Sequence, residues 1–222
     1  MRIPLVRRVL EANDLIAAEL RAGFEKAGLF AVNVMGSPGA GKTSLIEQTV
    51  EHTGSRLRIG VIEGDIATSL DADRIARFGV PVVQINTGGA CHLDAAMVRK
   101  ALDRLEVSGL GVLLIENVGN LVCPAQFDLG EACKVVVCSL PEGDDKVLKY
   151  PAIFSLASAV VLNKLDLLEH LKFDLSGFRR HLGELNPDAV LLEVSCVSGE
   201  GLERWMEWLE RGARNARQSG GR

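Results

Sequence analysis

The chain has 222 residues, of which 47% are hydrophobic and 24% are charged, and its formal net charge at pH 7 is −4. This balance is typical of a globular protein, and the length suits one α/β domain with a small extension. The negative charge argues against the broad basic surface that binds nucleic acid. No apolar run reaches the ~20 residues of a membrane span, and the first residues do not resemble a secretory signal. We therefore expect a soluble cytoplasmic protein with neither membrane nor nucleic-acid partners.

The N-terminal segment, residues 1–29, is predicted to form an amphipathic helix packed on the domain. Its apolar residues recur at the spacing of one helix face. They are Val6, Val9, Leu10, Ile16, Ala17, Leu20 and Phe24. Docking of this face to a membrane or to a partner is the less favoured alternative.

Beyond residue 29, short apolar runs alternate with segments of helical pattern. The runs are 30–35, 57–62, 82–85, 112–115, 135–137, 159–162 and 190–194. The helical segments are 42–52, 94–105, 175–185 and 201–213. Strands that are apolar on both faces and separated by helices indicate a parallel sheet covered on both sides. We predict one α/β domain over residues 30–213 and a flexible tail over 214–222.

A glycine-rich octapeptide, GSPGAGKT, follows the first predicted strand and matches the P-loop pattern G-x-x-x-x-G-K-S/T at every fixed position. Its glycines let backbone N–H groups point at phosphate oxygens, next to the positive end of a helix. Lys42 is expected to contact the β- and γ-phosphates, and the Thr43 hydroxyl to bind Mg²⁺. The predicted phosphate-binding residues are Gly36, Ser37, Pro38, Gly39, Ala40, Gly41, Lys42, Thr43 and Ser44. The fold predicted is therefore that of a P-loop NTPase.

Acidic residues at two strand ends are candidate ligands for Mg²⁺. Glu63 and Asp65 end the second strand, and Glu116 ends the fourth. Ligands of open α/β sheets bind outside the carboxyl ends of the strands, so these acids face the correct edge. We predict that Asp65 and Glu116 complete a catalytic and Mg²⁺-binding set with Lys42 and Thr43. The alternative for either acid is a solvated loop charge.

The base-binding motif is predicted from the sequence Asn163-Lys164-Leu165-Asp166, which matches the N-K-x-D pattern of GTP-binding proteins. The Asp166 carboxylate can accept hydrogen bonds from the N1–H and 2-amino groups of guanine, which adenine does not offer. Asn163 would brace the loop or the base, and the Lys164 stem would lie over the ring.

Catalysis is expected to be slow hydrolysis of GTP to GDP. Gly119 is expected to bring a backbone N–H close to the γ-phosphate, but no glutamine stands beside it to position water. A partner protomer is a candidate source of the missing group, and Lys146 is a speculative contributor in trans.

Cys91, His92 and Cys123 are the candidate ligands of a transition metal. Cys91 and His92 follow the third strand, and Cys123 lies in the loop after Glu116. If the two strands end at one edge, the three side chains can converge on a site that suits Zn²⁺ or Ni²⁺ and leaves a fourth position open. Spacing alone leaves open that these are ordinary buried residues, as we expect for Cys133 and Cys138.

Taken together, these segments resemble the HypB family of hydrogenase-maturation GTPases, which assist nickel insertion into NiFe hydrogenase. The resemblance runs from about residue 9 to 209. It rests on NVMGSPGAGKTSL, EGDIATSLDADRI, TGGACHLDAAMV, IENVGNLVCPAQFDLGE, PEGDDKVLKYP, LNKLDLL and SGEGLERWMEWL. It implies a SIMIBI-class GTPase fold, a Ni²⁺ or Zn²⁺ site at Cys91, His92 and Cys123, and a homodimer promoted by nucleotide or metal. The implied partners are a nickel-accessory protein and the hydrogenase large-subunit precursor.

The sequence departs from some family members in its N-terminal region. It begins MRIPLVRR and contains four histidines, so we expect the form without the Cys-rich or His-rich nickel segments. One alternative is a urease-type nickel-insertion GTPase, which carries Cys-Pro-His where this chain has Cys123-Pro124-Ala125. A second alternative is a metal carrier in which the nucleotide is only structural. A third is a small-molecule kinase, and the guanine motif argues against this one.

Overall fold

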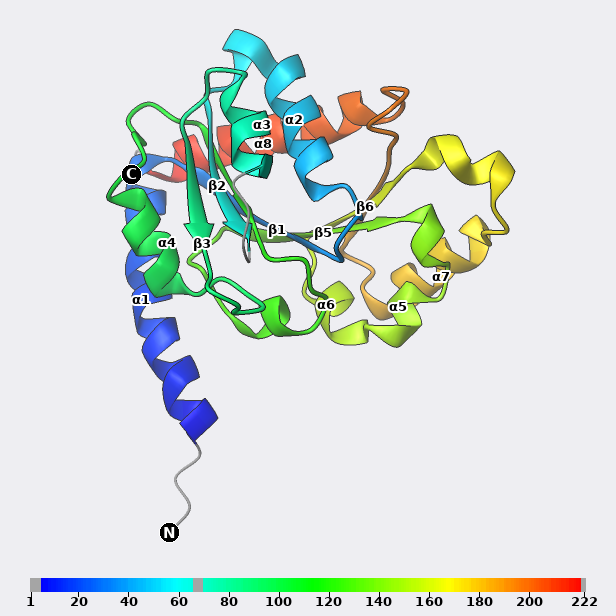
Figure 1. The fold of residues 1–222 in the computed structure, drawn as a ribbon, viewed down its shortest axis with the longest axis horizontal. Coiled ribbons are helices and arrows are strands. Elements are labelled where there is room, and N and C mark those ends of the chain that lie inside the picture. The colour runs from blue at the N-terminus through cyan, green and yellow to red at the C-terminus, as the bar shows by residue number, and fades with distance from the viewer. Residues whose placement is uncertain (1–4, 66–69, 221–222) are drawn as a thin grey trace.

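A computed structural model describes residues 5–65 and 70–220 of the chain. Within these residues, seven parallel strands form one sheet in the order β3-β2-β4-β1-β5-β6-β7 (Figure 1). The strands are β1 (Phe30–Gly36), β2 (Ile59–Asp65), β3 (Val82–Asn86), β4 (Val112–Glu116), β5 (Cys133–Ser139), β6 (Ala159–Asn163) and β7 (Val190–Glu193). Each apolar run that predicts a strand contributes one, and the parallel, helix-covered sheet predicted from the sequence is confirmed.

The helices follow the predicted alternation, with several short turns added. They are α1 (Leu5–Ala27), α2 (Lys42–Thr53), α3 (Leu70–Ala76), α4 (Ala95–Leu102), α5 (Lys146–Lys149), α6 (Pro151–Ser155), α7 (Leu175–Leu185) and α8 (Leu202–Gly220). The 3₁₀ turns are η1 (Gly54–Arg56), η2 (Cys123–Gln126), η3 (Leu140–Glu142) and η4 (Leu165–His170). None of the described helices is long and apolar enough to cross a membrane.

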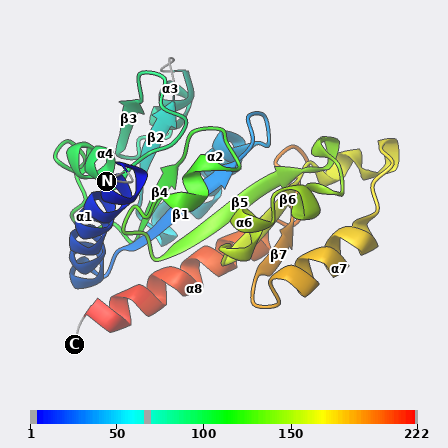
Figure 2. The same cartoon turned by 90° about the horizontal axis from the view of Figure 1, so that it is seen from below.

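Helices cover both faces of the sheet (Figures 1 and 2). On one face α2, α3 and α8 bury apolar side chains against alternate strand residues, with Trp205 fully enclosed. On the other face α1 and α4 pack over one half of the sheet, and α5, α6 and α7 pack over the other half. Because the central strands β1 and β4 are covered on both sides, every one of their residues is buried.

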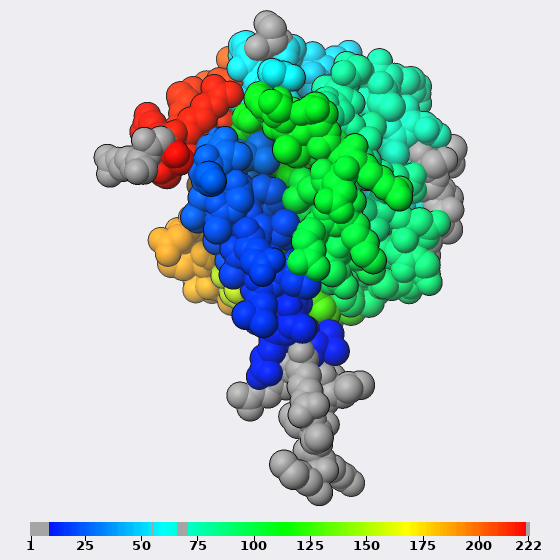
Figure 3. All heavy atoms as spheres, turned by 90° about the vertical axis from the view of Figure 1, so that its left-hand side faces the viewer, coloured from blue at the N-terminus to red at the C-terminus, as the bar shows by residue number. Residues whose placement is uncertain are grey.

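The N-terminal helix α1 lies beside α4, as the space-filling view shows (Figure 3). It buries Ala17, Leu20 and Phe24 in the core formed with α4. The Asn13 side chain accepts a hydrogen bond from Ala95 N at 2.9 Å and donates one to Asp128 O at 2.8 Å. These bonds tie α1 to the start of α4 and to the loop before β5, although the division of the chain at residue 29 stays a prediction.

The last helix, α8, continues beyond the end predicted for it at residue 213. Residues 214–220, which the sequence analysis assigns to a flexible tail, are helical in the structure. Ala216 packs against the core, and the end of α8 lies so close to α1 that a Cβ added to Gly220 would lie 2.3 Å from Glu25 O. Tertiary contact with α1 therefore holds a polar segment in the helix.

Candidate nucleotide and metal sites

The P-loop lies between the end of β1 and the start of α2, and its backbone is held closely by its neighbours. A Cβ added to Gly36 would lie 2.3 Å from Val137 O, and Gly41 has a φ of 96°, so both positions favour glycine. Lys42 Nζ donates to Ser37 O at 3.3 Å and lies 3.8 Å from Glu116 Oε1. The lysine ammonium group is therefore aimed into the loop, where phosphate oxygens bind in P-loop proteins.

A cavity of about 480 Å³ opens at the carboxyl edge of the sheet, beside the P-loop. It is lined by Pro38, Gly39, Gly41, Lys42, Thr43, Ser44, Glu63, Gly64, Asp65, Asp71, Arg74, Glu116, Asn117, Val118, Gly119 and Lys164. A slightly larger cleft of about 540 Å³ lies between α1 and α8 at the opposite edge and contains no predicted site residue. The smaller cavity is the candidate nucleotide site because it collects the predicted phosphate and Mg²⁺ groups.

Two buried carboxylates form the floor of this cavity. Glu63 on β2 pairs in register with Glu116 on β4, and their exposed fractions are 2% and 4%. Burial, together with the neighbouring Glu116 charge, raises the pKa of Glu63 to about 11. Burial also raises the pKa of Glu116, and the Lys42 charge opposes this rise. Glu63, a candidate ligand by its place at a strand end, is not among the predicted Mg²⁺ ligands, because its pairing with Glu116 follows only from the register of β2 and β4.

The oxygen atoms around this pair suit Mg²⁺. Thr43 Oγ1 donates to Glu116 Oε1 at 3.0 Å, which places the P-loop hydroxyl against the strand carboxylate. Glu63 Oε2 and Glu116 Oε2 are buried and accept no hydrogen bond from the described residues. Asp65 lies half-buried at the mouth of the same cavity. A hard cation with oxygen ligands would satisfy the orphaned oxygens and offset the repulsion between the acids.

The predicted guanine motif meets the P-loop from the end of β6. Asn163 Nδ2 donates to Ala40 O at 3.1 Å, and Lys164 Nζ donates to Gly39 O at 2.7 Å. Asp166 accepts a hydrogen bond from the Ser195 hydroxyl, in the segment that follows β7. Asn163 is therefore hydrogen-bonded to the phosphate loop and Asp166 to Ser195, while the roles predicted for them in binding GTP stay predictions.

Lys146, which the sequence analysis proposes as a contributor in trans, lies beside the P-loop of its own chain. Its Nζ donates to Ser37 Oγ at 3.4 Å, forms an ion pair with Glu142 Oε1 at 3.2 Å and lies 5.0 Å from the centroid of the Tyr150 ring. This position places a lysine near the phosphate loop within one protomer. The role in trans stays a prediction.

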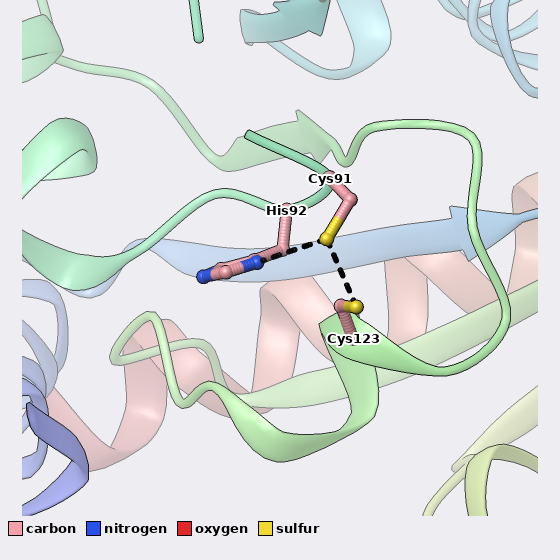
Figure 4. A group of neighbouring side chains, drawn as sticks. All are labelled: Cys91, His92 and Cys123. Carbon is pink, nitrogen blue, oxygen red and sulfur yellow. Dashed lines mark hydrogen bonds between the residues drawn. The ribbon is translucent and has the colours of Figure 1, made fainter. Parts of the chain in front are cut away.

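Cys91, His92 and Cys123 converge in the structure (Figure 4). Cys91 Sγ lies 2.9 Å from Cys123 Sγ and 3.6 Å from His92 Nδ1, and one ligand atom from each residue lies within 4.8 Å of the others. All three are half-buried, and within residues 5–65 and 70–220 no other group of three or more His, Cys, Asp or Glu meets this geometry. Two sulfurs and one imidazole match the donor set of Zn²⁺ and suit Ni²⁺.

The fold brings these ligands together across β2, which lies between β3 and β4. Leu93 packs beside the carboxyl end of β2, where a Cβ added to Gly64 would lie 2.8 Å from its side chain. The His92 ring stacks on Phe127 with the centroids 3.8 Å apart. The loop after β3 therefore passes over β2 and reaches the loop after β4.

Burial and hydrogen bonding shift the pKa of the His92 imidazole and of several thiols. Burial lowers the pKa of His92, so its imidazole is neutral, the form that binds metal. The hydrogen bond from Cys91 and then burial raise the pKa of Cys123. Burial raises the pKa of Cys133 to about 12 and that of the fully buried Cys138 well above its ordinary value. The half-buried Cys133 and the buried Cys138 therefore stay protonated at neutral pH, the form that binds metal poorly.

Comparison with known proteins decides the family. Residues 30–193 match the nucleotide-binding domain of the CobW/HypB/UreG family. The chain is 54% identical over 203 residues to hydrogenase maturation factor HypB of Azotobacter vinelandii, a match that covers 91% of this chain and 67% of that protein. The chain belongs to the HypB family of hydrogenase maturation factors. It is also 41% identical over 221 residues to the hydrogenase/urease maturation factor HypB of Helicobacter pylori strain J99, covering 98% of this chain and 90% of that one.

Solved structures support the same assignment. The crystal structure of HypB from Archaeoglobus fulgidus superposes with a TM-score of 0.86 at 41% identity, covering 91% of this chain and 99% of that chain. HypB from Helicobacter pylori in complex with nickel gives the same TM-score and identity over 92% and 96%. A LAO/AO transport system kinase, 18% identical with a TM-score of 0.58, shares the fold alone. The family and the SIMIBI-class fold predicted from the sequence are confirmed; the individual site residues remain predictions.

Proposed function

We propose that this protein is a GTP-hydrolysing nickel metallochaperone that assists nickel insertion into NiFe hydrogenase through a GTP-dependent switch. One observation carries the proposal: residues 116–123 begin at a carboxylate in the nucleotide cavity and end at a thiol of the metal cluster. A change at Gly119, which lines the cavity, must therefore pass along a short segment to Cys123. Two sites that share one loop are coupled reciprocally when that loop has two arrangements.

At the nucleotide site, this chain acts mainly by positioning and by charge. The P-loop N–H groups and Lys42 hold the phosphates, and the oxygens of Thr43, Asp65, Glu63 and Glu116 would hold Mg²⁺. When bound, Mg²⁺ supplies positive charge that offsets the charge developing on the phosphate oxygens. Intrinsic GTP hydrolysis is slow because the described cavity lining contains no glutamine to orient water.

Selection of guanine is assigned to Asp166. Its carboxylate accepts from the N1–H and 2-amino groups of guanine, and Ser195 holds it in position. Adenine offers neither donor, so binding ATP would remove water from the carboxylate without replacing its hydrogen bonds. This cost disfavours ATP.

Nickel is the cargo, and Cys91, His92 and Cys123 are its ligands, with Zn²⁺ the competing ion. The relative from Helicobacter pylori whose structure contains nickel supports the choice of metal. With a fourth coordination position open, the site can pass metal to another protein, which a closed four-ligand site does not do readily. The proposed partners are a second copy of the chain, a nickel-accessory protein and the hydrogenase large-subunit precursor, in the cytoplasm.

Delivery of nickel to urease is the second candidate function. The relative from Helicobacter pylori strain J99 bears the name hydrogenase/urease maturation factor, which favours it. The chain itself has Cys123-Pro124-Ala125, without the histidine expected of a urease-type GTPase. Nickel transfer assays with each apo-enzyme as acceptor would distinguish the two.

The deciding experiment measures nickel affinity in two nucleotide states. Ni²⁺ is titrated into the protein bound to GDP and bound to a non-hydrolysable GTP analogue, and molecular mass is measured in parallel. We expect the affinity or the mass to change by a clear margin between the two states, and Lys42→Ala to abolish GTP turnover. Equal nickel affinity and equal mass in both states would overturn the switch, and turnover that survives Lys42→Ala would overturn the assignment of the nucleotide site.

A further inference from the structure

Asn120 contacts both the phosphate loop and the metal cluster. Its backbone forms an isolated antiparallel bridge with Gly36, the first residue of the P-loop motif, and its N–H donates to Gly36 O at 3.0 Å. The main chain of Asn120 is therefore attached to the loop that surrounds the phosphates. A displacement of that loop at Gly36 would therefore pull on Asn120 through this bond.

The Asn120 side chain forms hydrogen bonds to both of the loops that carry the metal-ligand candidates. Asn120 Nδ2 donates to the backbone carbonyl of Cys91 at 3.3 Å, and Oδ1 accepts from Val122 N at 2.8 Å. Val122 immediately precedes Cys123, so the two bonds fix the backbone at one ligand and next to another. One amide group thus connects two loops that are far apart in the sequence.

The segment around Asn120 has little freedom to move independently of the P-loop. A Cβ added to Gly119 would lie 2.8 Å from Pro38 Cγ, so these two backbones are packed against each other. Asn117, 1% exposed, accepts from Leu93 N and from Val118 N, each at 3.0 Å. The segment is therefore fixed at its start by Asn117 and against the P-loop by Gly119 and Asn120.

We propose that Asn120 is the positioning residue that transmits the nucleotide state from the phosphate loop to the Cys91–His92–Cys123 site. The proposal rests on the switch described under the proposed function and assigns that switch to a residue. Only an amide of this length donates to the Cys91 carbonyl and accepts from Val122 N at the same time. Aspartate keeps the acceptor but loses the donor, and alanine loses both.

The test compares nickel dissociation constants in the two nucleotide states for wild type, Asn120→Ala, Asn120→Asp and a control, Asn86→Ala. Asn86 Oδ1 accepts from Gly88 N at 2.9 Å, so the control removes a side-chain bond from the loop that carries Cys91 without touching the P-loop. Ni²⁺ itself is the probe, followed by its thiolate charge-transfer absorption. Circular dichroism and GDP affinity show whether each variant is folded.

For wild type we expect the two nickel dissociation constants to differ by at least about 5-fold. In Asn120→Ala the ratio should fall to within about twofold of unity, in Asn120→Asp to an intermediate value, and in Asn86→Ala it should stay at the wild-type value. GDP affinity and the stoichiometry of one nickel per site should be unchanged in the folded variants.

The outcomes separate this proposal from the one it rests on. A wild-type ratio of one overturns the affinity switch itself. If both Asn120 variants keep the wild-type ratio of nickel dissociation constants, the role of Asn120 is overturned and the switch still stands. If Asn86→Ala loses the ratio as fully as Asn120→Ala does, the role of Asn120 is overturned as well. If Asn120→Ala does not fold, the near-isosteric Asn120→Asp decides: an unchanged ratio there refutes the proposal.

Discussion

Replacing Glu63 by glutamine should stabilise the nucleotide-free protein, because the buried acid costs free energy at neutral pH. In the unfolded chain the pKa of Glu63 is 4.5, whereas burial and Glu116 raise it to about 11 in the folded chain. Glu63 therefore takes up a proton on folding at pH 7. Its contribution to stability is fully present below pH 4.5 and is lost progressively as the pH rises toward 11. Glutamine is neutral at every pH and close in shape to the protonated acid.

At pH 7 the free-energy cost of burying Glu63 is set by the difference between pH 7 and the unfolded pKa of 4.5. The exact value of the folded pKa does not matter, as long as it lies well above 7. At about 1.36 kcal/mol for each pH unit, Glu63→Gln gains up to about 3 kcal/mol at pH 7. The gain should grow by about 1 kcal/mol for each pH unit between roughly pH 5.5 and 7.5.

Urea unfolding of the metal- and nucleotide-free protein, followed by circular dichroism across that pH range, measures the difference. Glu184→Gln, the same substitution at an exposed position on α7, is the matched control and should parallel wild type. Wild-type and Glu63→Gln curves that run parallel with pH, or a Glu63→Gln variant less stable than wild type at pH 7, would refute the reasoning. Mg²⁺-dependent nucleotide binding should weaken in the same variant, since glutamine cannot release a proton and supply an anionic ligand when the cation binds.

Three further predictions address the metal site, base selection and acid stability. Cys91→Ala and Cys123→Ala should each abolish tight nickel binding while GTP binding stays intact; isothermal titration would contradict the ligand assignment if either variant kept wild-type nickel affinity. Asp166→Ala should weaken GTP binding by about 100-fold and leave nickel stoichiometry unchanged, with an unaltered GTP Kd as the contrary result. Burial alone would raise the pKa of Asp128, but the hydrogen bonds from Arg21 and from Gly130 N outweigh it, so the pKa is lowered. Its stabilising contribution is therefore present above pH 3.8 and lost as the pH falls through the folded pKa. Asp128→Asn should cost below about 1 kcal/mol at pH 7, because the ion pair is partly exposed, and should show a shallower loss of stability in acid.

Features made by consecutive residues could be predicted from the sequence. The P-loop is a local structure, in which glycines and a helix start place backbone N–H groups around the phosphates, so its residues are recognisable without a fold. The guanine motif is similarly local. Apolar runs separated by helical segments determine a parallel sheet, since such strands must be covered on both faces. The carboxyl edge of that sheet then indicates where candidate ligands gather.

Features that depend on which strands are neighbours were decided only by the tertiary structure. Glu63 faces Glu116 because β2 and β4 pair in register, and no spacing along the chain reveals that pairing. Cys91 meets Cys123 because the loop after β3 crosses the end of β2, and Asn120 connects the metal cluster to the phosphate loop through the bridge to Gly36. Residues 214–220 stay helical through contact with α1. In each case the interacting groups are distant in sequence, and the packing of whole elements, rather than the pattern of residues, sets their separation.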